Sequence, residues 1–160
     1  MMKIKGIPQL VCSIVICQLA GIIGSFFTFP SIPTWYAALE KPSFNPPSWL
    51  FSPVWITLFL LMGVSLYLVW SGGAKTRYAK IALTLFGIQL MLNILWSIIF
   101  FGLKSPFYAF IEIAILWVAI LLTIFKFFKI SKTAAYLLIP YILWVSFAAV
   151  LNFSIWIINL

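Results

Sequence analysis

Five apolar stretches, each long enough to cross a lipid bilayer, constrain this chain more than any other feature of its sequence. They lie at residues 7–29, 53–70, 79–101, 106–125 and 133–158. A hydrocarbon core of about 30 Å requires about 20 helical residues, and a helix satisfies its own backbone hydrogen bonds there. The sequence therefore predicts an all-α membrane protein, a five-transmembrane-helix bundle that forms a single domain over residues 1–160.

The composition favours lipid over water as the solvent. Hydrophobic residues make up 65% of the chain and charged residues 8%, against about 25% charged residues in soluble domains. The net charge of +8 is spread in small groups between apolar runs, which argues against a nucleic-acid partner. The sequence contains no His, the commonest general base and haem ligand. We therefore expect no metal site and no conventional catalytic constellation.

The basic residues predict the orientation in the cell membrane. Because cytoplasmic loops carry the excess of Lys and Arg, we expect the N-terminus in the cytoplasm and the C-terminus outside. A signal peptide is the alternative for the first stretch, but that stretch is about twice as long as an ordinary signal-peptide core. On the N-terminal side lie Lys3, Lys5, Lys75, Arg77, Lys80, Lys126, Lys129 and Lys132, and on the opposite side lie Lys41 and Lys104.

The connection at residues 30–52, on the predicted outer side, is longer than the others. Disorder is one interpretation of a loop of this length. Its aromatic residues and prolines favour a stiff segment that packs, because aromatic rings gain from burial and proline reduces the entropy lost on ordering. We therefore predict that it caps a pocket between the helices, with a short helix near residues 34–39.

Polar and aromatic side chains share helix faces beneath this connection. Because polar groups avoid lipid unless a partner satisfies them, these faces should point into the bundle. Trp55, Trp96 and Trp144 are expected to line a pocket, whereas an interfacial belt is the ordinary alternative for tryptophan. We assign that belt to Trp70, Trp117 and Trp156. The inward faces comprise Gln18, Gly21 and Ser25; Gln89, Asn93, Trp96 and Ser97; and Tyr141, Trp144, Ala148, Leu151 and Asn152.

Glu112 is one of two acidic residues and lies within the fourth stretch, where an ionised carboxylate is costly. It is either a proton or cation site, or a protonated or hydrogen-bonded carboxyl that holds helices together. Transporters tend to carry further intramembrane charges and internal repeats, and the sequence shows neither. The structural role is therefore favoured, and a transporter of small molecules or ions, or a membrane scaffold, stays the alternative function.

Four motifs resemble one known family. They are Trp35-Tyr36-x-x-Leu39-x-Lys41-Pro42-x-Phe44-x-Pro46-Pro47, Pro53-x-Trp55, Asn93-x-x-Trp96, and Pro140-Tyr141-x-x-Trp144-x-x-Phe147-Ala148-x-x-Leu151-Asn152. In this order, and with five spans, the chain resembles a bacterial member of the translocator protein or tryptophan-rich sensory protein family (TspO/MBR, the peripheral-type benzodiazepine receptor).

The resemblance implies a pocket on the loop side, often in a homodimer, that binds tetrapyrroles such as protoporphyrin IX and isoquinoline carboxamide or benzodiazepine drugs. It also implies light-dependent breakdown of protoporphyrin IX, a ligand or substrate and not a resident cofactor. As a second hypothesis, light-excited porphyrin is oxidised, and Trp55 and Trp144 channel the reactive oxygen or radicals. The cholesterol motif of animal members is missing from residues 151–160. Carried onto matching positions, the ligand-binding residues are Tyr36, Pro46, Pro47, Trp55, Phe59, Asn93, Trp96, Trp144, Phe147, Ala148 and Leu151.

Overall fold

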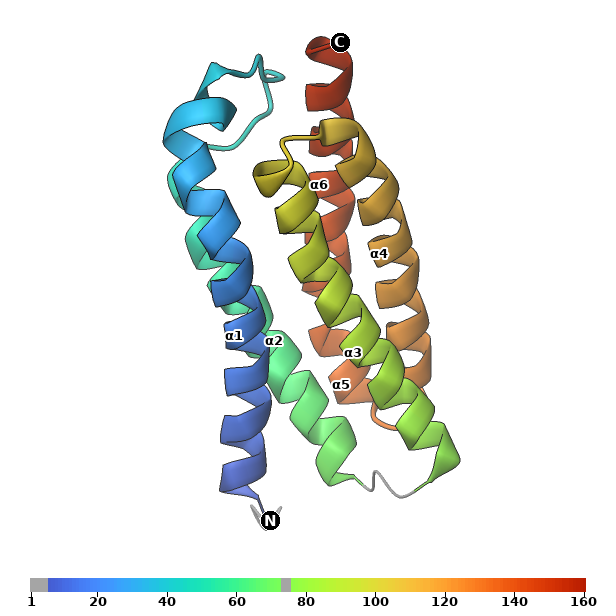
Figure 1. Ribbon diagram of the computed structural model, residues 1–160. Coiled ribbons are helices and arrows are strands. Elements are labelled where there is room, and N and C mark those ends of the chain that lie inside the picture. Colours follow the sequence, from blue (N-terminus) through green and yellow to red (C-terminus); the bar gives the residue numbers. More distant parts are fainter. Residues whose placement is uncertain (1–5, 73–75) are drawn as a thin grey trace.

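The computed structural model describes residues 6–72 and 76–160, which form helices joined by short connections (Figure 1). Five helical segments are long and apolar enough to span a membrane, which confirms the predicted five-span architecture. They are Ile7–Tyr36, Ser48–Ser71, Arg77–Gly102, Pro106–Phe128 and Lys132–Ile158. Consecutive spans run in opposite directions, so the described chain begins and ends at opposite ends of the bundle (Figure 1).

Within these spans the individual elements are shorter, because two spans end in a π-helical turn and one is broken. Helix α1 packs against α2 and α3, while α4 packs against α3, α5 and α6. The elements are α1 (Ile7–Ser31), η1 (Ile32–Tyr36), α2 (Ser48–Ser71), α3 (Arg77–Ser97), η2 (Ile98–Gly102), α4 (Pro106–Phe128), α5 (Lys132–Leu137) and α6 (Ile139–Ile158).

The first span is longer than predicted, because it continues through Pro30 to Tyr36. A proline lacks the N–H of the helical hydrogen bond, but transmembrane helices accept it where hydroxyl side chains and a local π-turn satisfy the freed groups. Pro30 frees the carbonyl of Phe26, four residues earlier. In the turn that follows Pro30, Thr34 Oγ1 donates to the Pro30 carbonyl oxygen at 2.8 Å, and Ser31 Oγ donates to that of Phe101 at 2.9 Å, so hydroxyl side chains stabilise the continuation of the span. The predicted boundary at residue 29 is therefore wrong, and the predicted helix near residues 34–39 is formed as a continuation of the first span, with helical residues up to 38.

The second and fifth spans also differ from the predicted boundaries. Helix α2 begins at Ser48, before Pro53, so the connection that follows η1 is much shorter than the predicted residues 30–52. The fifth span breaks between Leu137 and Ile139, just before Pro140. Proline fits the first turn of a helix, where its missing N–H needs no partner, and this explains why α6 starts there.

Two glycines allow α1 and α2 to pack closely. A Cβ atom on Gly63 would lie 2.6 Å from the Cα atom of Ile14, and one on Gly21 would lie 2.6 Å from the ring of Phe59. Small residues at a helix crossing let two backbones approach, which is the usual mode of packing in membranes. The crossing at Gly63 therefore fixes the position of α2 against α1.

The basic residues are divided between the two ends of the bundle as predicted. Arg77, Lys80, Lys126, Lys129 and Lys132 lie where α2 connects to α3 and α4 to α5, and Lys41 and Lys104 lie at the opposite end. Three residues of the orientation argument, Lys3, Lys5 and Lys75, lie outside the described residues. The orientation relative to the bilayer stays a prediction.

Candidate functional site

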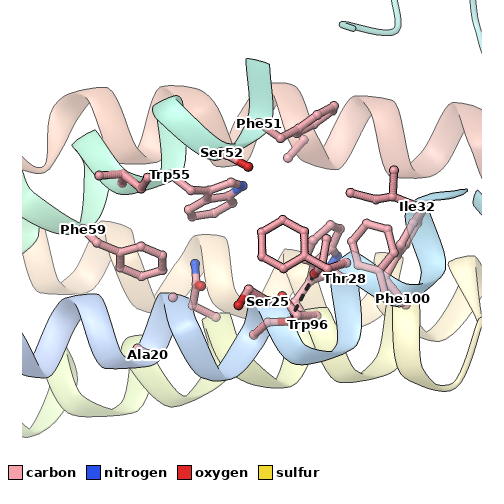
Figure 2. Close-up of a pocket in the computed structure, with 18 of the residues that line it drawn as sticks. Ala20, Ser25, Thr28, Ile32, Phe51, Ser52, Trp55, Phe59, Trp96 and Phe100 are labelled. Atoms are coloured by element: carbon pink, nitrogen blue, oxygen red, sulfur yellow. Dashed lines mark hydrogen bonds between the residues drawn. The ribbon is translucent and has the colours of Figure 1, made fainter. Parts of the chain in front are cut away.

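A cavity of about 290 Å³ lies between α1, α2, α3 and α6, at the end of the bundle that carries η1. Figure 2 shows Phe51, Ser52 and Trp55 of α2 on one side of it and Ser25 and Thr28 of α1 on the other. Three helices each contribute one tryptophan to its wall. Of the residues predicted to bind a ligand, those that line the cavity are Tyr36, Trp55, Phe59, Asn93, Trp96, Trp144, Ala148 and Leu151.

Pro46, Pro47 and Phe147 lie near the cavity but not among its lining residues. Pro47 precedes the first turn of α2. Phe147 contacts Phe44 at a ring-centroid distance of 6.3 Å and Trp144 at 5.5 Å. The role of these three residues in ligand binding stays a prediction.

The sequence argument missed part of the wall that α1, η1 and η2 provide. The missed residues include Thr28 and Ile32, which continue the face of Gly21 and Ser25, and Phe100 of η2. A signal for the first two was present, because Gly21, Ser25, Thr28 and Ile32 follow helical spacing. It was obscured by the prediction that the helix ends at residue 29.

A chain of hydrogen bonds joins α3 to α6 at the cavity. Asn93 Nδ2 donates to the Tyr141 hydroxyl oxygen at 3.0 Å, and this hydroxyl donates to Gln89 Oε1 at 2.9 Å. All three side chains are buried. Polar side chains in a membrane interior are stable when such partners satisfy them. The chain of bonds holds Asn93, one of the polar residues of the wall, in one orientation.

A second set of hydrogen bonds fixes Trp96. Its Nε1 donates to Asn152 Oδ1 at 3.0 Å, and Asn152 Nδ2 donates to the carbonyl oxygen of Pro106 at 2.8 Å. The Trp96 ring also stacks on Phe100 at 5.1 Å and 20°. Three segments, α3, α6 and the start of α4, thus determine where this indole lies. The predicted inward faces of the third and fifth spans are confirmed.

Trp144 differs from Trp96 because its polar atom has no protein partner. Its Nε1 is buried and forms no hydrogen bond within the described part of the chain. The ring contacts Phe51 edge-on at 6.0 Å and 70°, and Trp55 on the facing helix stacks on Phe59 at 5.5 Å and 29°. A buried donor without a partner costs about 1–3 kcal/mol. Trp144 thus lines the cavity, and its N–H lies enclosed without a hydrogen-bond partner among the described residues.

The segment between η1 and α2 is folded against the cavity, as the stiff-loop interpretation predicts. The Tyr36 hydroxyl donates to Asn45 Oδ1 at 2.8 Å. Lys41 Nζ donates to the Leu39 carbonyl oxygen at 2.9 Å and lies 4.8 Å from the centroid of the Tyr36 ring. These bonds fix the loop to a residue that itself lines the cavity.

Sequence comparison agrees with the geometry, since the TspO/MBR family model matches residues 13–157. The chain belongs to the TspO/MBR family. It is 46% identical to Tryptophan-rich protein TspO of Chlorobaculum tepidum over 97% of this chain and 98% of the relative. Identity to the protein of the same name from Archaeoglobus fulgidus is also 46%, over 96% and 99%. The human Translocator protein is 39% identical over 87% of this chain and 83% of its own.

Family membership and the five spans identify the chain as a multi-pass protein of the cell membrane, with the lipid bilayer as its surroundings.

The tryptophans of this TspO/MBR protein do not all have the roles that were predicted for them. Trp117 lies in the middle of α4 and donates from Nε1 to Ser146 Oγ of α6 at 2.8 Å. Its assignment to an interfacial belt is wrong, because the indole N–H serves as a tie between two helices.

Glu112 of this TspO/MBR protein is buried in α4 and does not line the cavity. Neither carboxyl oxygen has a hydrogen-bond partner among the described residues. The predicted hydrogen-bonded tie between helices is therefore not formed. A neutral carboxyl is the form that such surroundings favour, since an unpaired buried charge is far more costly.

Proposed function

We propose that this protein is a membrane receptor or sensor that binds tetrapyrroles such as protoporphyrin IX, and isoquinoline carboxamide or benzodiazepine-type ligands, in the aromatic cavity. The observation that carries the proposal is the convergence of Trp55, Trp96 and Trp144 from three helices on one cavity. Aromatic walls with a few placed polar groups are typical of sites for flat apolar ligands. Family membership supports the same class of function.

The polar atoms of the wall suit a ligand with few hydrogen-bonding groups. Asn93 presents one oriented amide, while the lining Gln18, Ser25 and Asn152 already form hydrogen bonds within the protein. Stacking on indole and phenyl rings would supply most of the affinity, because binding of such ligands scales with buried apolar area. The absence of His from the sequence favours an iron-free porphyrin over haem bound through an axial imidazole.

Ligand size decides how much of the site is used. The cavity of about 290 Å³ is at the lower limit of drug-binding pockets, which span about 300–1,000 Å³. Ile22 and Ile56 line it and are 51% and 59% exposed, so the cavity is not closed between α1 and α2. A two-ring drug fits inside, whereas a tetrapyrrole would extend into this opening or displace the loop.

Titration of the purified protein with protoporphyrin IX tests the proposal. We expect saturable quenching of tryptophan fluorescence and a matching shift of the porphyrin absorption band. The double variant Trp55→Phe with Trp144→Phe should weaken binding at least tenfold by the absorption readout, while Trp156→Phe, outside the cavity, should leave it unchanged. Equal affinity of the double variant and the wild type would exclude the cavity as the binding site.

Light-dependent breakdown of the bound porphyrin is a second candidate, favoured by the position of Trp55 and Trp144 on the same cavity. The photochemistry would come from the ligand, and the indoles would contact its excited state. Illumination of the complex should then consume porphyrin faster than illumination of free porphyrin in the same lipid. Equal rates would leave the protein a binding protein without catalytic activity.

We also propose that the protein forms a homodimer through the lipid-facing side of α3. A shallow apolar groove there is lined by Thr84, Gly87, Ile88 and Met91, among others. Small residues promote helix association in membranes because they let backbones approach. Since Met91 is 66% exposed, Met91→Trp should fill the groove without disturbing the monomer. Light scattering of the detergent complex should show a dimer for the wild type and a monomer for the variant.

A further inference from the structure

One side chain joins the loop after η1 to the end of α6. The Glu40 backbone N–H donates to Asn159 Oδ1 at 3.0 Å, and Asn159 Nδ2 donates to the Glu40 carbonyl oxygen at 2.9 Å. The two residues are separated by 119 positions in the sequence. The amide of Asn159 thus satisfies both backbone groups of one loop residue, a pairing that needs both a donor and an acceptor on the same side chain.

Asn159 ends a ridge of α6 that also forms part of the cavity wall. Phe147, Leu151, Ile155 and Asn159 follow at four-residue intervals, which places them along one ridge of the helix. Leu151 and Ile155 line the cavity. The loop contacts the same ridge, since Leu39 packs against the cluster that contains Leu151 and Ile155. A shift of the loop along this ridge would therefore change access to the cavity.

The other hydrogen bonds of the loop give it its shape but do not attach it to α6. The bond from Tyr36 to Asn45 and the bond from Lys41 to Leu39 connect the loop to itself and to η1. Among the described residues, only the Asn159 amide forms hydrogen bonds between residues 37–47 and a span other than the first and second, which this loop connects. Both residues of this pair are exposed, so water competes for their polar atoms and the pair can open without unfolding the bundle.

We propose that Asn159 is a positioning residue that latches the loop over the cavity and so slows the exchange of its ligand. The effect on ligand exchange rests on the proposed function, whereas the latch itself does not require a ligand. The physical basis is that a tetrapyrrole exceeds the enclosed volume of the cavity. Where the ligand enters or leaves beneath the loop and not through the opening between α1 and α2, the loop must be displaced, and the two hydrogen bonds to Glu40 oppose that displacement.

Hydrogen exchange and ligand release together test the latch in the full-length protein in lipid nanodiscs. In Asn159→Ala we expect the Glu40 amide to exchange roughly tenfold faster, because two hydrogen bonds of modest net strength are lost. Protoporphyrin IX should dissociate faster by a similar factor. Ser154→Ala is the matched control, because the Ser154 hydroxyl donates only within α6, to the Val150 carbonyl oxygen. Both rates should stay at the wild-type value in this control.

Asn159 Nδ2 also donates to the Ile155 carbonyl oxygen at 2.8 Å, so a simple helix-capping role is the competing explanation. Faster exchange confined to the last turn of α6, with Glu40 unchanged, would show capping and overturn the latch. Faster exchange at Glu40 with an unchanged porphyrin dissociation rate would overturn the control of ligand exchange. If the wild type binds no porphyrin, the proposed function fails, and with it the proposed effect of the latch on ligand exchange. The hydrogen-exchange rate of the Glu40 amide then still decides whether the latch itself exists.

Discussion

Replacement of Tyr141 by Phe tests whether the hydrogen-bond chain between α3 and α6 stabilises the bundle. The change removes one hydroxyl that accepts from Asn93 and donates to Gln89, and it leaves both partners buried. An orphaned buried group costs about 1–3 kcal/mol, while interhelical hydrogen bonds in membranes average about 0.6 kcal/mol with a maximum near 1.7. We therefore expect Tyr141→Phe to lower the free energy of unfolding by about 1–2 kcal/mol.

Reversible unfolding in mixed micelles, followed by circular dichroism, measures this free energy. Tyr108→Phe is the control, since Tyr108 is 63% exposed and should change stability by less than about 0.5 kcal/mol. The double variant Tyr141→Phe with Gln89→Leu should regain part of the loss, because it leaves one orphaned group, Asn93 Nδ2, in place of two. A double variant that loses the full sum of both single effects would refute the reasoning.

Three further predictions concern packing, the cavity wall and the buried carboxyl. Gly63→Ala should destabilise the protein by about 1–3 kcal/mol in the same assay, because the new Cβ would meet the backbone of α1; an unchanged stability would contradict the close crossing. Asn152→Ala should weaken protoporphyrin IX binding about tenfold by absorption titration, since Trp96 loses the hydrogen-bond acceptor that fixes its orientation. Glu112→Gln should leave this affinity unchanged, whereas loss of ion flux in proteoliposomes would favour a transporter.

The sequence was sufficient to predict the spans and the inward faces because both depend on short-range periodicity. Asn93, Trp96 and Trp144 reach the cavity as helical spacing requires. The errors arose at prolines, where local rules and membrane packing disagree. Pro30 lies inside a span that continues into a π-turn. The Ser31 hydroxyl ties this turn to the Phe101 carbonyl oxygen, a tertiary contact that the proline alone does not reveal.

Long-range pairs were beyond sequence reasoning for a different reason. Nothing in the spacing of Asn159 and Glu40 indicates that they meet, since their pairing depends on how the ends of two distant segments come together. The same holds for Trp117 and Ser146, whose hydrogen bond links α4 to α6. Trp117 was assigned to an interfacial belt because such belts are the ordinary position of tryptophan in membrane proteins. Its position in the middle of α4, within reach of the Ser146 hydroxyl, instead makes it a link between two helices.

The tight contact at Gly63 has a consequence for the breadth of ligands that this fold accommodates. Trp55 lies eight residues before this contact on α2, or about 12 Å at the helical rise of about 1.5 Å per residue. Rotation of α2 about the contact point would move the indole by roughly 0.2 Å for every degree, from the same rise. A substitution at Gly63 that rotates α2 by several degrees would thus move the Trp55 side of the cavity by about 1 Å, from the same rise. The residues that touch the ligand would stay the same.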